Sequence, residues 1–82
     1  SGIGGVMLNP GDLRTFRVKN EWAYLSFGNG IRFEDGETVL LLRERTARNP
    51  WGHTSDGWDI LAGGKVLFVA AGALLEYSEP VQ

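Results

Sequence analysis

The sequence predicts an all-β domain: a small barrel of five to six strands with at most one short helical turn near the C-terminus. Short β-prone runs follow one another closely, with turn residues between them. The pair Gly63-Gly64 joins two of these runs, and glycine readily adopts the positive φ that a two-residue hairpin turn requires. The helix-compatible stretch at residues 70–73 is short and broken by a glycine, so it predicts a single turn.

The chain begins with a turn and a strand. Asn-Pro-Gly-Asp at residues 9–12 predicts a turn, because proline presets φ and glycine accepts the conformation that follows. Residues 13–18 then form a β-prone run in which Leu13, Phe16 and Val18 are expected to point inward. Their spacing departs from the two-residue period of a regular strand, so a bulge or a bend is expected there.

The next segment contains two more turns. Residues 22–27 are aromatic and β-prone, and Gly-Asn-Gly at residues 28–30 ends that run as a turn. Residues 31–34 alternate apolar and charged side chains, which indicates a half-buried segment. The acidic run with a glycine at residues 34–37 predicts another turn before the next strand.

The clearest predicted strand spans residues 38–45, apolar in its first half and charged in its second. A polar loop is expected at residues 46–55, and the Gly63-Gly64 hairpin follows it. Residues 74–77 are expected to form the last short strand, and Pro80 is expected to end the ordered chain.

The composition allows one small domain and narrows its partners. The 82 residues include no cysteine, so disulfides and thiolate metal sites are excluded, and the 43% hydrophobic residues must supply the core. The net charge of −2 removes a general electrostatic case for nucleic-acid binding. No apolar run approaches the ~20 residues that span a bilayer, and residues 1–6 lack the features of a signal peptide. We therefore expect a flexible arm at residues 1–8 and a single barrel domain at residues 9–79, in a cytoplasmic or virion-associated protein that does not bind membranes.

The order of several motifs is similar to that of a known family. An apolar-polar-Phe segment, an acidic turn with glycine and a long apolar strand occupy residues 31–42; they are followed by Asp56-Gly57-Trp58, the Gly63-Gly64 hairpin and the runs at residues 67–69 and 74–77. Over residues 11–77 the chain thus resembles Src-homology-3-like barrels. The opening at residues 9–13 also resembles short uncharacterised proteins encoded by bacteriophages, which implies a structural or accessory role.

The chain departs from the peptide-binding members of that family. Those members have a proline after the Phe of a Gly-Phe-Pro turn and a tyrosine soon after it, which together with the Trp line a groove for polyproline. Val69-Ala70-Ala71 stands in that place here, and the first strand lacks the family's paired tyrosines. The resemblance therefore implies the barrel and carries over only Trp58 as a groove residue, so polyproline recognition is not expected.

Trp51 is a candidate contact residue because it lies in a polar loop, next to Pro50 and Gly52. Exposed tryptophan is enriched at binding hot spots, so Trp51 could anchor a ligand or a partner. Large aromatic side chains are usually buried, so it could instead fold back over the mouth of the barrel.

Three arginines form a second candidate feature around Glu44: Arg43, Arg45 and Arg48. On a strand, the first two point to the same face. With Trp51 and His53 nearby, the group could bind a phosphate or stack on a base, or it could be a solvated strand end in an acidic protein.

Catalysis and metal binding find no support in the sequence. His53, Ser55 and Asp56 are the residue types of a hydrolytic triad, but three neighbours on one loop rarely adopt its geometry. A single histidine cannot form a metal site alone, and the turn at residues 34–37 lacks the ordered ligand positions of a calcium loop. Residues 28–30 are not followed by a helical pattern, which removes a phosphate-binding reading. We expect no enzyme activity, no cofactor and no metal.

Apolar side chains exceed what the inside of a small barrel can hold. Residues 38–42 and 66–69 are apolar on both faces. The side chains that point outward must be covered from solvent by another segment. They are Leu40, Leu42, Leu67 and Val69, or their alternate neighbours. Either residues 19–29 wrap over them or another subunit does. The favoured hypothesis is thus a protein-interaction or assembly module that binds another protein or its own copies; the alternative is a nucleic-acid-binding barrel that uses the arginines with Trp51 and Trp58.

Overall fold

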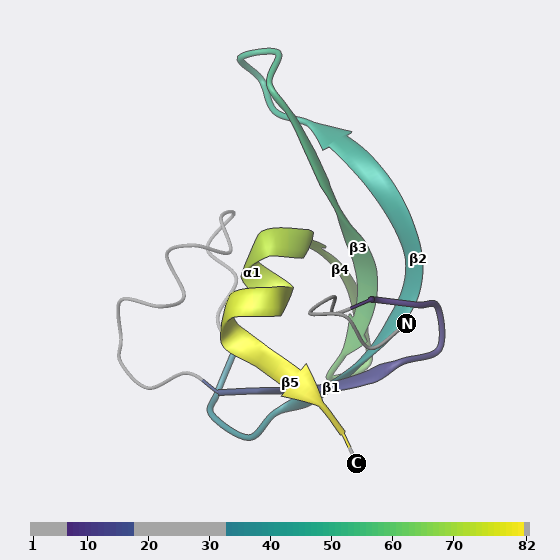
Figure 1. The fold of residues 1–82 in the computed structure, drawn as a ribbon. Coiled ribbons are helices and arrows are strands. Elements are labelled where there is room, and N and C mark those ends of the chain that lie inside the picture. The colour runs from purple at the N-terminus through teal and green to yellow at the C-terminus, as the bar shows by residue number, and fades with distance from the viewer. Residues whose placement is uncertain (1–6, 18–32, 82) are drawn as a thin grey trace.

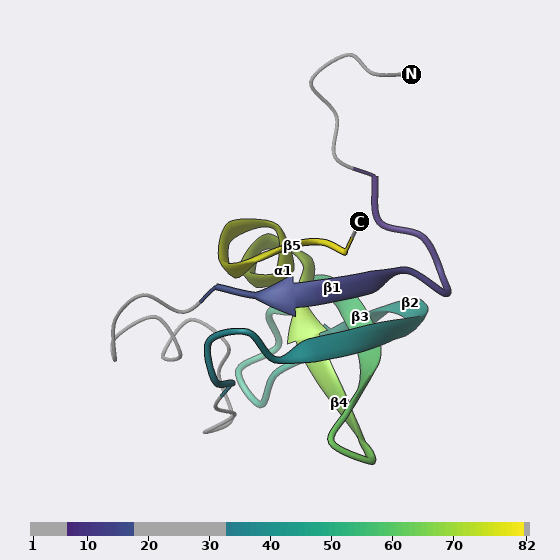
Figure 2. The same ribbon diagram turned by 90° about the horizontal axis from the view of Figure 1, so that it is seen from below.

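The computed structural model describes residues 7–17 and 33–81. Its elements are β1 (Leu13–Phe16), β2 (Thr38–Arg48), β3 (Thr54–Ala62), β4 (Lys65–Ala70), α1 (Ala71–Tyr77) and β5 (Ser78–Pro80). The strands form one antiparallel sheet in the order β4-β3-β2-β1-β5 (Figure 1), with β1 between β2 and β5 (Figure 2). The prediction of an all-β domain is therefore confirmed.

The sheet is not closed, since β4 and β5 are its two edges and no strand pairing joins them in the described residues. The helix α1 lies between these edges in the chain and contacts β3, β4 and β5. It buries Ala73 and Leu74 in the core. The open side of the curved sheet is thus covered by a helix rather than by a further strand pairing (Figure 1).

The predicted turns are confirmed where the structure describes them. The Asp12 N–H donates to Asn9 O at 3.1 Å, and the Glu37 N–H donates to Glu34 O at 3.1 Å. Gly63 and Gly64 connect β3 to β4 with φ values of 57° and 79°, the left-handed geometry that only glycine adopts without strain. Local turn chemistry therefore determines these three chain reversals.

The predicted polar loop at residues 46–55 is wrong at both ends. β2 continues to Arg48 and β3 begins at Thr54, so that only residues 49–53 form the loop. The β-branched Thr46 and Thr54 suit extended backbone, and the Thr46 hydroxyl donates to Asp56 Oδ1 across the pair at 3.0 Å. Cross-strand pairing therefore extends the hairpin beyond its apolar part.

The predicted strand at residues 74–77 is also wrong, because those residues belong to α1 and the last strand, β5, starts at Ser78 and includes Pro80. The helix spans seven residues and exceeds the single turn expected at residues 70–73. Leu74 is fully buried, and its carbonyl accepts hydrogen bonds from the Ser78 N–H, the Ser78 hydroxyl and Arg14 Nη2. These bonds satisfy the end of the helix and turn the chain into β5.

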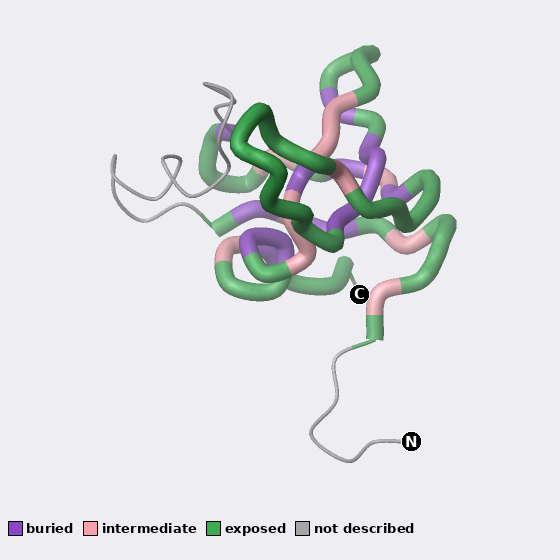
Figure 3. The backbone as a smooth tube through the Cα atoms, turned by 90° about the horizontal axis from the view of Figure 1, so that it is seen from above, coloured by how far each residue is buried: buried purple, intermediate pink, exposed green. Residues whose placement is uncertain are grey.

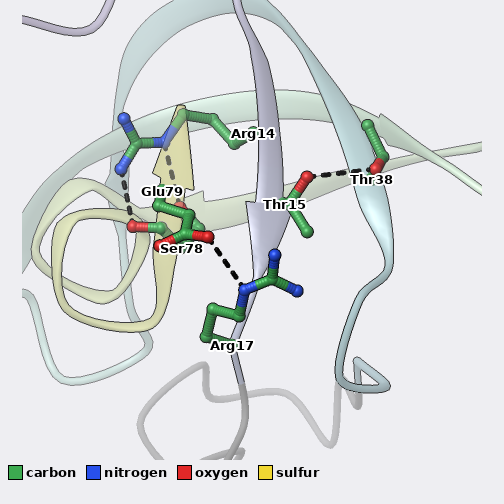
Figure 4. Close-up of polar contacts among 6 residues, drawn as sticks. All are labelled: Arg14, Thr15, Arg17, Thr38, Ser78 and Glu79. Carbon is green, nitrogen blue, oxygen red and sulfur yellow. Dashed lines mark hydrogen bonds and ion pairs between the residues drawn. The ribbon is translucent and has the colours of Figure 1, made fainter. Parts of the chain in front are cut away.

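In β1 the inward residues are Arg14 and Phe16, and the expectation that Leu13 points inward is wrong: Leu13 is 48% exposed, whereas Arg14 is 3% exposed. Arg14 Nε donates to Ser78 Oγ at 3.0 Å and Nη2 donates to Ser78 O at 2.8 Å (Figure 4). Burial lowers the pKa of Arg14, and Asp12 and Glu79 partly oppose that shift. The buried guanidinium ties β1 to the junction of α1 and β5, which explains why a charged residue faces inward.

The core lies between the inner face of the sheet and α1. Its buried side chains come from every described element except β5: Phe16, Phe33, Val39, Leu41, Trp58, Ile60, Ala62, Val69, Ala73 and Leu74. The rings of Phe16 and Phe33 stack with centroids 4.0 Å apart, and Leu8 packs half-buried against this core. Of the four apolar residues expected to need cover, Val69 is buried and the others are partly exposed or exposed.

A bulge at Leu42 changes which face of β2 the side chains occupy. Leu41 pairs with Ile60 and Arg43 pairs with Asp59, so that Leu42 is the extra residue. Leu41 therefore points into the core, whereas Arg43, only two residues later, lies on the outer face beside Asp59. The first strand, where a bulge or a bend was expected, pairs with β2 in regular register over Leu13, Arg14 and Thr15.

Several predictions lie outside the described residues. They are the run at residues 22–27, the turn at residues 28–30, the inward side chain of Val18, the covering segment at residues 19–29 and most of the N-terminal arm.

Candidate functional site

The six predicted contact residues lie on the β2–β3 hairpin but in three different places. Trp58 belongs to the core, Arg43 and Arg45 lie at the base of the hairpin, and Arg48, Trp51 and His53 lie at its tip. The structure therefore divides into three places the residues that the sequence analysis treated as one contact surface.

The outer part of the hairpin projects from the sheet as an arm, which we define as residues 46–56 (Figure 1). Its three strand pairs are Thr46↔Asp56, Ala47↔Ser55 and Arg48↔Thr54, and no other described strand pairs with them. Every residue of the arm is exposed except Ala47, which is half-buried (Figure 3). The arm therefore contributes nothing to the core and is available for contact.

The tip of the arm has a defined conformation. The Asn49 side-chain Oδ1 accepts hydrogen bonds from the Trp51 and His53 backbone N–H groups, both at 3.0 Å. The Asn49 N–H donates to His53 O at 2.8 Å, and the Gly52 N–H donates to Asn49 O at 3.0 Å. Gly52 has a φ of 85°, and Pro50 fixes its own φ. Four hydrogen bonds thus hold a five-residue loop.

Trp51 is 80% exposed at this tip. The alternative in which it folds back over the sheet is wrong, since such a contact would bury the indole. The hydrogen-bonded loop therefore presents the indole of Trp51 to solvent.

The base of the arm carries a cluster of two arginines on one carboxylate. Arg43 Nε donates to Asp59 Oδ2 and Arg45 Nε donates to Asp59 Oδ1, each at 2.8 Å. These hydrogen bonds hold the pKa of Asp59 below its usual range, against the opposing effect of burial. The Asp59 side chain is 10% exposed, whereas those of Arg43 and Arg45 are 74% and 41% exposed. The expectation that both arginines share a face is confirmed.

The same cluster includes the Phe68 ring and Gly57, neither of which was among the predicted contact residues. The Arg45 guanidinium carbon lies 4.7 Å from the centroid of the Phe68 ring, within cation–π range. A Cβ built on Gly57 would lie 2.5 Å from Phe68 Cζ, so the ring occupies the space that any side chain at Gly57 would need. The available sequence signal was the alternation of Asp59 with the buried Trp58 and Ile60, which places Asp59 on the outer face.

Trp58 is 2% exposed and packs in the core. Its side chain therefore stabilises the fold and is not accessible to a partner in this conformation, contrary to the expectation of a groove residue.

The residue types of a hydrolytic triad are not brought together. Ser55 and Asp56 are neighbours on β3 and point to opposite faces, and Asp56 accepts the hydrogen bond from Thr46. Across residues 7–17 and 33–81 there is no group of three metal-ligating side chains. No helix in these residues is both long and apolar enough to cross a membrane.

No protein-family model matches this chain, and no curated protein sequence or solved structure shows significant similarity to it.

Proposed function

We propose that this protein is a non-enzymatic protein-interaction or assembly module whose contact element is the tip of the arm. The observation that carries the proposal is Trp51, which is 80% exposed on a loop held by four hydrogen bonds. Tryptophan is the residue most enriched at binding hot spots, where truncation to alanine commonly costs about 2 kcal/mol or more.

The rigidity of the tip strengthens this proposal. A side chain on a flexible loop loses conformational entropy on binding, and this loss is reduced when the loop is already ordered. In the unbound protein, the Asn49 side-chain oxygen already accepts hydrogen bonds from the backbone N–H groups of Trp51 and His53. The tip therefore presents its indole in one backbone geometry, as a preorganised anchor for an apolar pocket on another protein.

The fold proposal is a Src-homology-3-like barrel. It is supported by the motif order at residues 31–77, by the return of β5 to pair with β1, and by the short helix between β4 and β5. The narrower proposal of a phage-encoded structural or accessory protein, in the cytoplasm or in a virion, rests on the resemblance of residues 9–13.

A nucleic-acid-binding role is the second candidate, favoured by Arg48 and His53 beside Trp51 at the tip, where an indole could stack on a base. The net charge of the arm favours this role less than protein binding. The arm carries one arginine and one aspartate, so its net charge is zero with neutral histidine. Arg43 and Arg45 are engaged by Asp59. A neutral arm is better suited to a protein partner than to a phosphate backbone.

Selection from a random peptide library tests the first candidate. The wild-type protein is expected to enrich peptides that lose at least about 30-fold in affinity when Trp51→Ala is introduced, the equivalent of 2 kcal/mol. Leu75→Ala is the matched control, because Leu75 is 45% exposed on α1 and is not part of the arm. Peptides that bind Trp51→Ala and the wild type equally would refute the assignment of the tip.

Titration with a single-stranded oligonucleotide tests the second candidate. Salt-sensitive binding that requires Trp51 and Arg48, without any peptide enrichment, would replace the first proposal by the second.

A further inference from the structure

The outer face of the sheet carries a continuous row of apolar side chains that the arm does not use. Strand pairing places Leu13 opposite Leu40, Leu40 opposite Leu61, and Leu61 opposite Val66. Directly opposed residues of an antiparallel pair lie on the same face, so these four form one line across β1, β2, β3 and β4.

The row continues at the C-terminal end of the chain. Arg14 pairs with Pro80, and the Val81 N–H donates to Leu13 O at 3.1 Å, so Val81 stands opposite Leu13. We call Val81, Leu13, Leu40, Leu61 and Val66 the outer row. Leu40 is half-buried, and the other four are between 38% and 60% exposed. An apolar line across the full width of a small sheet, exposed to water, is typical of an interface.

The two sides of the outer row differ in charge. On one side Thr15 and Thr38 face each other, Glu79 forms an ion pair with Arg17 (Figure 4), and the acidic turn at residues 34–37 precedes β2. On the other side Arg43 and Arg45 bind the single carboxylate of Asp59, which leaves an excess of one positive charge. Along the chain direction of β2, negative charge at the acidic turn therefore comes first, the apolar Leu40 second and the positive charge of Arg43 and Arg45 last.

We propose that the outer row is the contact through which two copies of this chain pair face to face. This proposal goes beyond the proposed function of the arm and uses a different surface. A two-fold axis along the row reverses the direction of β2 in the second copy. Each apolar side chain then faces its own counterpart, and the arginines of one copy lie over the acidic turn of the other. The charge order makes the face complementary to itself.

The size of the face sets the strength of the pairing. Five strands about 4.8 Å apart make the row about 19 Å wide, and one flanking residue row on each side gives a patch of roughly 300 Å² per copy. Stable dimers bury about 800 Å² per partner, so the pair is weak and dissociates on dilution.

Sedimentation equilibrium tests the pairing. The wild type is expected to change from monomer to dimer between about 1 µM and about 500 µM, the range for a small interface. Leu61→Lys, which puts a charge in the row next to its middle residue Leu40, is expected to remain monomeric with an unchanged far-UV circular dichroism spectrum. Leu75→Lys, the same change at an exposed leucine on α1, and Trp51→Ala are expected to dimerise like the wild type. If Leu61→Lys dimerises as strongly as the wild type, the proposal is overturned. A wild type that is monomeric at all concentrations, as expected if residues 19–29 of the same chain cover the row, also overturns it.

A cysteine experiment tests the geometry. The chain has no native cysteine, so Leu61→Cys introduces a single thiol. On the proposed axis this thiol faces its counterpart, and mild oxidation is expected to give a covalent dimer at concentrations where Leu75→Cys stays mostly monomeric. Equal cross-linking of the two variants overturns the two-fold arrangement.

Salt gives an independent readout. Raising sodium chloride from about 50 mM to about 500 mM is expected to weaken the dimer, because it screens the contact between arginines and acidic turn. Stronger association at high salt would contradict the charge pairing. Trp51→Ala is expected to leave this dimer intact. An experiment that refutes recognition by the arm therefore does not refute pairing through the outer row, and the reverse also holds.

Discussion

Replacing Gly57 with alanine tests the packing at the base of the arm. The new Cβ would lie 2.5 Å from the carbonyl oxygen of Val69 and 2.5 Å from Phe68 Cζ, about 0.9 Å closer than the 3.4 Å at which ordinary contact begins. The phenyl ring can rotate away, but the carbonyl belongs to β4, which is paired with β3 along its whole length. The backbone of two strands must therefore separate locally.

The expected cost follows from that overlap. Overpacking a well-packed site typically costs about 1–3 kcal/mol, and a clash with backbone belongs at the upper end. A domain of this size has a free energy of unfolding of roughly 4–12 kcal/mol. The loss lowers the melting temperature by roughly 10–20 °C. Thermal and urea unfolding followed by circular dichroism measure both quantities.

The matched control is the same substitution at Gly72, which lies in α1 with nothing within 4 Å of a built Cβ. Alanine there is expected to stabilise the protein by about 0.5–1 kcal/mol, because it reduces the entropy of the unfolded chain and favours the helix. The two alanine variants should therefore move in opposite directions. A Gly57→Ala protein that melts at the wild-type temperature would refute the described contact between β3 and β4.

Two further outcomes are expected. Replacing both Gly63 and Gly64 with alanine places Cβ atoms at φ values of 57° and 79° and should cost on the order of 1 kcal/mol per site, measured by urea unfolding; an unchanged midpoint would contradict the hairpin geometry. Asp59→Asn should flatten the acid dependence of stability. The two arginines lower the folded-state pKa of Asp59, so its contribution is complete above the unfolded value of about 3.9 and is lost as the pH falls through the lower folded value. The free energy of unfolding is measured against pH for the wild type and the variant. If the two plots stay parallel between about pH 5 and about pH 2, the carboxylate contributes no such stability.

The features that sequence alone predicted are those that local chemistry decides. Gly63-Gly64 reverses the chain because few other residues adopt that backbone, and the turn at residues 34–37 forms for a similar reason at Gly36. The shared face of Arg43 and Arg45 follows from strand geometry alone. The sequence placed Trp51 in a loop but left its exposure open, since the conformation of that loop depends on four hydrogen bonds that no composition rule supplies.

The features that sequence missed depend on residues far apart in the chain. Residues 74–77 were expected to form a strand, yet they are helical because Leu74 fills the core and its carbonyl is bound by Ser78 and by Arg14, which lies 60 residues earlier. Arg14 itself was not expected inside, since only its contacts with Ser78 make burial of a guanidinium acceptable. Asp59 was missed as the partner of the arginines because the bulge at Leu42 brings Arg43 to its side.

The bulge at Leu42 also separates two parts of the hairpin that can change independently. Among the described residues, no core side chain lies between Leu42 and Gly57, although Leu41 and Trp58 on either side are buried. Substitutions in residues 49–53 are therefore expected to change the surface of the loop without a cost in core packing, provided that the Asn49 and Gly52 geometry is kept. Deleting Leu42 itself would remove the extra residue and leave a regular ladder in which Arg43 still pairs with Asp59 on the outer face, because consecutive strand residues point to opposite faces. The hairpin is thus a loop that can be exchanged on an unchanged base, which suits it to the grafting of new binding sequences in the laboratory.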